Sequence, residues 1–112
     1  MKRERDRIRN LLLRLEGEPQ GFLIVAGLLN ASDEERADEY HLKLMADEGL
    51  VVETDEAVWR LTALGHDAVE ALEVNAFWEK LKSAGPKEAY ELLKGATSSL
   101  AVTAISKLMG WG

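Results

Sequence analysis

The chain has 112 residues, a net charge of −6 at pH 7 and no cysteine. This length suits one domain, and a hydrophobic content of 46% is typical of a folded protein. Without cysteine there is neither a disulfide framework nor a thiolate metal site, and we expect a cytoplasmic protein. We expect no secretory signal and no membrane span, because the N-terminus is charged and the uncharged run 95–106 is too short to cross a bilayer.

The charges are unevenly distributed along the chain. Residues 1–14 carry a balance of +4, whereas the remaining residues carry −10. A basic N-terminal arm therefore precedes an acidic body. The basic residues of this arm are Lys2, Arg3, Arg5, Arg7, Arg9 and Arg14.

The first predicted element is an amphipathic helix over about residues 2–16. Its apolar residues recur at helical spacing, as Ile8, Leu11, Leu12 and Leu15 do. Gly17 and Pro19 end this helix. The apolar, β-prone run over residues 22–25 then predicts a short strand.

The next segment predicts a helix followed by a hairpin. Ser32 and Glu35 have the spacing of a capping box, so a helix begins after Ser32. Gly49 is well placed to end it in a left-handed conformation. Two apolar runs, residues 50–52 and 58–61, flank a polar tip and predict a two-stranded hairpin.

Two further helices are predicted after the hairpin. Thr62 is a candidate cap for a helix that extends to about Ser83, and Gly85–Pro86 breaks the chain. A last helix covers roughly residues 87–109. We therefore expect a domain over residues 1–84 and a C-terminal helical extension over residues 85–112, packed together as one structural unit.

Three blocks of the chain resemble a family of small winged-helix proteins common in phage and prophage genomes, a domain of unknown function. The blocks are SDEERADEYHLKLMADEGLV, RLTALGHDAVEAL and the basic start MKRERDRIRNLLLRLE. The resemblance implies an α+β fold of winged helix-turn-helix type, with a two-stranded wing and one or two extra C-terminal helices. It implies no activity and no site residues.

In such a fold the helix after Ser32 is the one that reads DNA, yet its start is acidic. DNA affinity comes largely from Lys and Arg that neutralise phosphates, and here the helix begins with Asp33, Glu34 and Glu35. The simplest interpretation is that these acids favour the helix start and are solvated. The alternative is a face that binds another protein. Its candidate residues are Glu35, Glu39, Leu42, Lys43 and Ala46.

The basic arm is the one candidate for nucleic-acid contact. Its six basic residues could touch the DNA backbone without reading sequence, which keeps a DNA-binding transcriptional regulator as the second hypothesis. We favour the alternative that these side chains pair with the acidic body or solubilise the first helix.

The last predicted helix is almost uncharged and has a wide apolar face. Part of this face is expected to be core, but a small domain has limited core surface to offer. The excess predicts a homodimer or a complex with a host protein. The candidate contact residues are Leu100, Ala104, Ile105, Leu108, Met109 and Trp111.

Catalysis finds no support in the sequence. Asp38 with His41, and His66 with Asp67, each offer only two of the three or four convergent ligands that a metal site needs. No phosphate-binding loop or nucleophile motif is present, and we expect both histidines to be structural. We therefore expect no catalytic residue, cofactor or metal. The leading hypothesis is a non-enzymatic interaction protein, for example an inhibitor or adaptor acting on a host protein.

Overall fold

The chain forms helices and short strands in the computed structural model, which describes residues 1–25, 31–95 and 98–110. The elements are α1 (Arg5–Gly17), β1 (Leu23–Ile24), α2 (Asp33–Asp47), β2 (Val51–Asp55), β3 (Val58–Leu61), α3 (Ala63–Leu72), α4 (Asn75–Ser83), α5 (Pro86–Lys94) and α6 (Ser99–Leu108).

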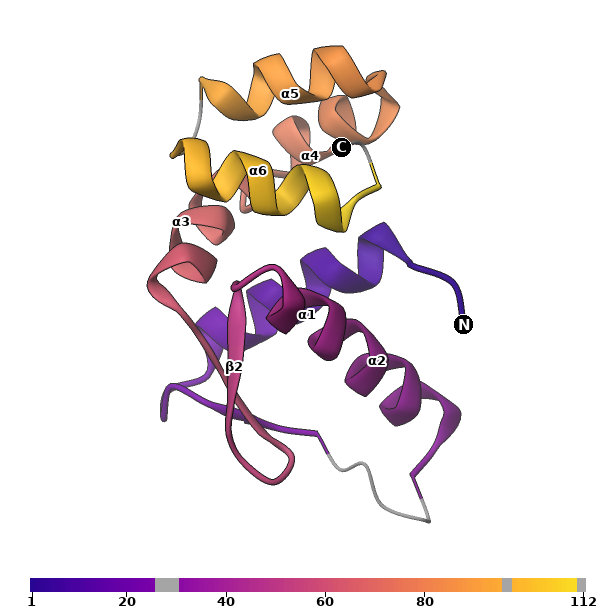
Figure 1. The fold of residues 1–112 in the computed structure, drawn as a ribbon, viewed down its shortest axis with the longest axis vertical. Coiled ribbons are helices and arrows are strands. Elements are labelled where there is room, and N and C mark those ends of the chain that lie inside the picture. The colour runs from indigo at the N-terminus through magenta and orange to yellow at the C-terminus, as the bar shows by residue number, and fades with distance from the viewer. Residues whose placement is uncertain (26–30, 96–97, 111–112) are drawn as a thin grey trace.

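The three strands form one small antiparallel sheet in the order β1-β3-β2. Helix α1 contacts β3, α2 and α3, so it lies at the centre of the molecule. Helix α6 packs on α3 and α5, which places the last three helices at one end (Figure 1). The start of α2 and the tip of the β2–β3 hairpin lie at the opposite end (Figure 1). The expected α+β class is confirmed.

Helix α1 buries the residues that its spacing predicts. Ile8, Leu11, Leu12 and Leu15 are all at most 3% exposed. The helix begins at Arg5 rather than near Lys2, because Glu4 has an extended backbone and serves as its N-cap.

Helix α2 begins and ends as the sequence predicts. The Ser32 hydroxyl accepts from the Glu35 N–H, and the Glu35 carboxylate accepts from the Ser32 N–H, so the capping box is confirmed. Gly49 has a φ of 78°. The Leu50 N–H donates to the Met45 carbonyl at 3.0 Å, which makes this helix end a Schellman motif. The chain then enters the expected hairpin.

Gly65 lies where α3 meets the beginning of the hairpin. A Cβ at this position would collide with the carbonyl oxygen of Leu50 and crowd the side chain of Leu61. We expect Gly65→Ala to lower the free energy of unfolding by about 2 kcal/mol, because a well-packed site has to shift to accept a methyl group. Urea unfolding measures the loss. The same change at Gly85, with nothing within 4 Å of its added Cβ, is the matched control and should have little effect.

Two predicted helices are wrong, because each is divided in two. The chain is extended at Val74, between α3 and α4, so the helix predicted from Thr62 to Ser83 does not continue. The Ser98 hydroxyl accepts from the Ala101 N–H and begins α6, which separates α6 from α5. In the described part of the chain, α5 and α6 are the helices that follow residue 84, which agrees with the one or two C-terminal helices expected there.

The break before α6 explains a second correction. Ala104, Ile105, Leu108 and Met109 were predicted as an interface, but each is at most 4% exposed within the chain's own core. Because α6 folds back onto α3 and α5, its apolar side is covered by the same molecule. Leu100 remains 73% exposed, and Trp111 lies outside the described residues. Among the described helices, none is long and apolar enough to cross a membrane.

Candidate functional site

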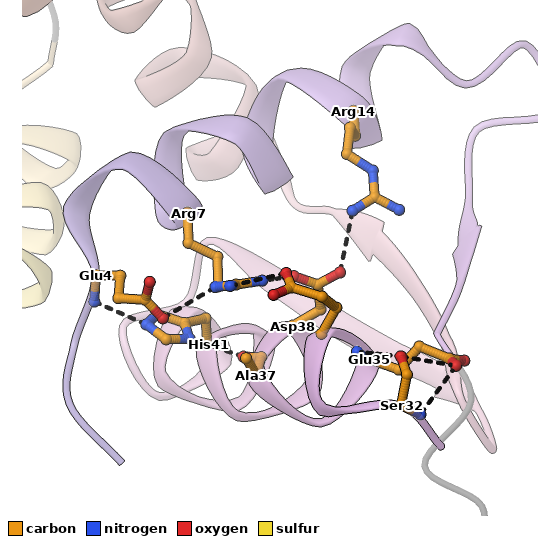
Figure 2. A network of polar contacts seen from close by, with 9 residues as sticks. Glu4, Arg7, Arg14, Ser32, Glu35, Ala37, Asp38 and His41 are labelled. Atoms are coloured by element: carbon orange, nitrogen blue, oxygen red, sulfur yellow. Dashed lines mark hydrogen bonds and ion pairs between the residues drawn. The ribbon is translucent and has the colours of Figure 1, made fainter. Parts of the chain in front are cut away.

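The side chain of Asp38, on α2, holds two arginines of α1. Arg7 Nη1 donates to Asp38 Oδ1 at 2.7 Å, and Arg14 Nη1 donates to Asp38 Oδ2 at 3.1 Å (Figure 2). The two arginines are two helical turns apart, so they project from the same side of α1. The Arg7 and Asp38 side chains are only 18% and 14% exposed. This bridge fixes α2 against α1.

Arg7 binds two more carboxylates. Its Nη2 lies 2.9 Å from Glu34 Oε2, and its Nε donates to Glu4 Oε2 at 3.1 Å. The hydrogen bond to Asp38 raises the pKa of the Arg7 guanidinium above its usual value. Burial opposes this shift, and the bonds to Glu34 and Glu4 add to it. A phosphate would have to displace these carboxylates to reach Arg7.

Arg9 caps the end of α3. Its Nε donates to the Leu72 carbonyl at 2.8 Å, and its Nη2 donates to Asn75 Oδ1 at 2.7 Å. The guanidinium also lies 5.6 Å from the centre of the Trp78 ring, within the range of a cation–π contact. A cation is favourable at a helix C-terminus, where the last carbonyls have no partner in the helix.

Arg3 and Arg5 cap the C-terminal end of α6. Arg3 Nη1 donates to the Lys107 carbonyl at 3.2 Å, and Arg5 Nε donates to the Met109 carbonyl at 3.1 Å. All five arginines of the arm thus bind groups of their own chain, while Lys2 is exposed. The sequence favoured ion pairs between these arginines and the acidic body. This is confirmed for Arg7 and Arg14, which bind Asp38. The helix-capping role of the other three was not predicted.

His41 is completely buried between α2 and the start of α1. Its Nδ1 lies 2.7 Å from the Ala37 carbonyl oxygen, and its Nε2 accepts the Glu4 N–H at 2.8 Å (Figure 2). A backbone N–H only donates, so Nε2 has no proton and Nδ1 carries it. Both ring nitrogens are therefore occupied in structural hydrogen bonds. His66 is exposed on α3.

The predicted protein-binding face of α2 is only partly at the surface. Leu42 is fully buried, so its prediction as an exposed contact is wrong. Leu42 lies in the core, whereas Leu44 is half-buried at its edge. Ala46 is also half-buried against the core. Lys43 is exposed and bridges to Glu39 at 3.0 Å.

The start of α2 and the turn of the β2–β3 hairpin lie at the same end of the molecule (Figure 1), and both carry exposed acidic residues. We call this region the acidic end and define it by five exposed residues, Asp33, Glu34, Glu53, Asp55 and Glu56. Glu34 binds Arg7, as described above. Glu35 is half-buried in the capping box and so supports the helix start next to this region.

A pair of glutamates joins the far end of α1 to the end of α3. Burial raises the pKa of Glu16, and a hydrogen bond with Glu73 and its charge raise it further. The ionised form is therefore less favourable in the folded chain than in the unfolded chain, where the ordinary value is 4.5. While Glu16 is protonated, it causes no loss of stability. As the pH rises from 4.5 through the higher pKa of the folded chain, Glu16 ionises and the free energy of unfolding decreases.

We therefore expect Glu16→Gln to raise the melting temperature at neutral pH. The gain should disappear at acidic pH, below the unfolded value, because wild-type Glu16 is then protonated in both states. Thermal unfolding at a series of pH values measures this. Glu18→Gln, on the same segment, is the control, and an equal gain in that variant would contradict the assignment to the Glu16–Glu73 pair.

The residues that the structure describes include no group of three or more histidine or acidic side chains that could hold a metal ion. A groove of about 610 Å³ lies over the Arg7–Asp38 bridge, but its charged lining residues are already bonded within the chain, Asp6 to Lys82 and the others to one another.

The fold and contacts define a small α+β protein whose N-terminal arginines hold its helices together. The model of the hypothetical-protein family DUF2513 matches residues 2–91, and the chain belongs to that family. It is also 29% identical to an uncharacterized protein of Haemophilus influenzae, over 97% of this chain and 99% of the relative. No solved structure matches the chain. The expected family of unknown function is thus confirmed at that level.

Proposed function

We propose that the protein is a non-enzymatic winged-helix protein that binds a basic surface of another protein through its acidic end. The order of α1, β1, α2 and the β2–β3 hairpin supports the winged-helix interpretation, with α2 in the place of the DNA-reading helix and the hairpin as the wing. The resemblance to phage and prophage proteins favours a cytoplasmic inhibitor or adaptor that acts on a host protein.

One observation carries this proposal. The arginines of the basic arm are bonded within the chain, whereas the start of α2 and the hairpin tip present exposed carboxylates. A phosphate backbone would be repelled by that end, since nucleic-acid affinity depends on cations that neutralise phosphates. A protein surface rich in Lys and Arg is the complementary partner.

The test is a comparison of two charge variants of equal net change in pull-downs from host cells. Asp33→Asn with Glu56→Lys alters the acidic end, and Glu88→Gln with Glu91→Lys alters exposed acids of α5. We expect a protein recovered with wild type and with the α5 variant to be lost with the acidic-end variant. Equal recovery with both variants would overturn the proposal.

The second candidate remains a DNA-binding regulator. We expect no sequence-specific duplex binding at physiological salt, and any weak binding should fall steeply as salt rises, because it would consist of backbone contacts. Fluorescence anisotropy with mixed duplex DNA measures both properties. Tight, salt-resistant binding to one sequence, lost in a Lys43→Glu variant of α2, would establish the DNA-binding alternative.

Self-association through α6 is now a weaker candidate than it was from the sequence. Of the five predicted contacts on or next to α6 that the structure describes, only Leu100 is exposed. A single exposed leucine is common on protein surfaces and does not by itself define an interface.

A further inference from the structure

His41 joins two parts of the chain that are 37 residues apart in sequence, and it does so through one hydrogen bond. The donor is the backbone N–H of Glu4, the N-cap of α1, and the acceptor is His41 Nε2 on α2. We propose that this hydrogen bond is an acid-sensitive latch, and that protonation of His41 releases the N-terminal segment, residues 1–4, from α2.

The chemistry of the ring determines which bond breaks. Nε2 is the unprotonated nitrogen of the imidazole, and its lone pair accepts a hydrogen bond from the Glu4 N–H at 2.8 Å. A proton taken from solvent binds to Nε2 and leaves an N–H facing an N–H. The Nδ1–H still donates to the Ala37 carbonyl at 2.7 Å, so the ring stays on α2 while the segment loses its acceptor.

The groups around His41 favour a local opening. From α1, the Glu4 carboxylate and the Arg7 guanidinium face this region, and they bind each other (Figure 2). From α2, Asp38 is held by Arg7 and Arg14, and the Tyr40 ring meets the imidazole edge-on at 5.3 Å between centroids. When the imidazole gains its charge, the Asp38 carboxylate is already bound to two arginines and the Glu4 carboxylate is bound to Arg7.

The latch also positions a distant contact. Arg3 directly precedes Glu4 and donates to the Lys107 carbonyl at the end of α6. When the Glu4 N–H is released, the backbone before α1 loses the bond that orients it, and Arg3 loses its place at that helix end. The device therefore connects protonation on α2 with release of the Arg3 side chain from the end of α6.

The test is backbone NMR of the full chain at about pH 7.5 and about pH 5, which bracket the ordinary titration of histidine. In wild type we expect the order parameters of residues 2–4 to fall from about 0.85 to below about 0.6 in acid, while α2 stays rigid. The His41 ring nitrogens and the Glu4 amide should change together. The exposed His66, in the same samples, serves as the internal control.

His41→Gln is the matched variant, because a carboxamide oxygen can accept the Glu4 N–H and does not titrate in this range. We expect residues 2–4 of this variant to keep their order at both pH values. Ordered residues 2–4 in wild type at about pH 5, or protonation of the His41 ring without a change at Glu4, would overturn the proposal even if the variant fails to fold.

Discussion

Replacing Ile105 with alanine is expected to lower the free energy of unfolding by about 3 kcal/mol. Ile105 is fully buried on α6, the helix that packs on α3 and α5. The substitution removes buried methyl and methylene groups and leaves a cavity that a packed core closes only in part. The loss is a loss of the chain's own stability, because α6 is covered by the same molecule.

Leu100→Ala is the matched control on the same helix. Its side chain is 73% exposed, so we expect a change within about 0.5 kcal/mol. Urea unfolding, monitored by tryptophan fluorescence, measures both variants. A large loss for Leu100→Ala, together with a loss of molecular mass in light scattering, would show that α6 contributes to an assembly and would contradict this assignment.

Removing the Asp38 carboxylate should also cause a large loss of stability. We expect Asp38→Ala to lower the free energy of unfolding by about 3 kcal/mol, because it leaves the half-buried Arg7 cation without its principal partner. The Asp38 side chain is 14% exposed and binds Arg7 and Arg14 together. Arg14→Ala should lose at most about 1 kcal/mol, since the Arg14 side chain is 50% exposed.

A double-mutant cycle with Arg7→Met and Asp38→Ala measures the interaction free energy between these two side chains. We expect a coupling of about 1–3 kcal/mol, because the two groups are in direct contact and largely buried. A coupling near zero would mean that Asp38 acts mainly through α2 itself and would contradict the assigned bridge.

Much of this fold can be predicted from local sequence patterns. The apolar spacing of α1, the capping box at Ser32 and the left-handed Gly49 are each determined by residues within a few positions of one another. These predictions are confirmed because a local hydrogen bond or one buried helix face decides them.

The remaining features depend on contacts between distant residues. Arg9 meets the Leu72 carbonyl 63 residues away, and Arg5 meets the Met109 carbonyl 104 residues away, so no sequence spacing shows that these arginines cap helices. Leu42 was misplaced for a related reason. Tyr40, Leu44 and Leu42 are all apolar enough to face a core, and tertiary packing decides which one is buried.

The acidic end is proposed to bind a protein with a basic surface. The most direct test places a photo-reactive amino acid at Glu56, on the hairpin tip, or at Leu100, on α6, and irradiates cells that produce the variants. Both positions are exposed. We expect one discrete adduct with a basic protein from position 56 and none from position 100. An adduct only from position 100, or a nucleic-acid adduct from position 56, would contradict the claim.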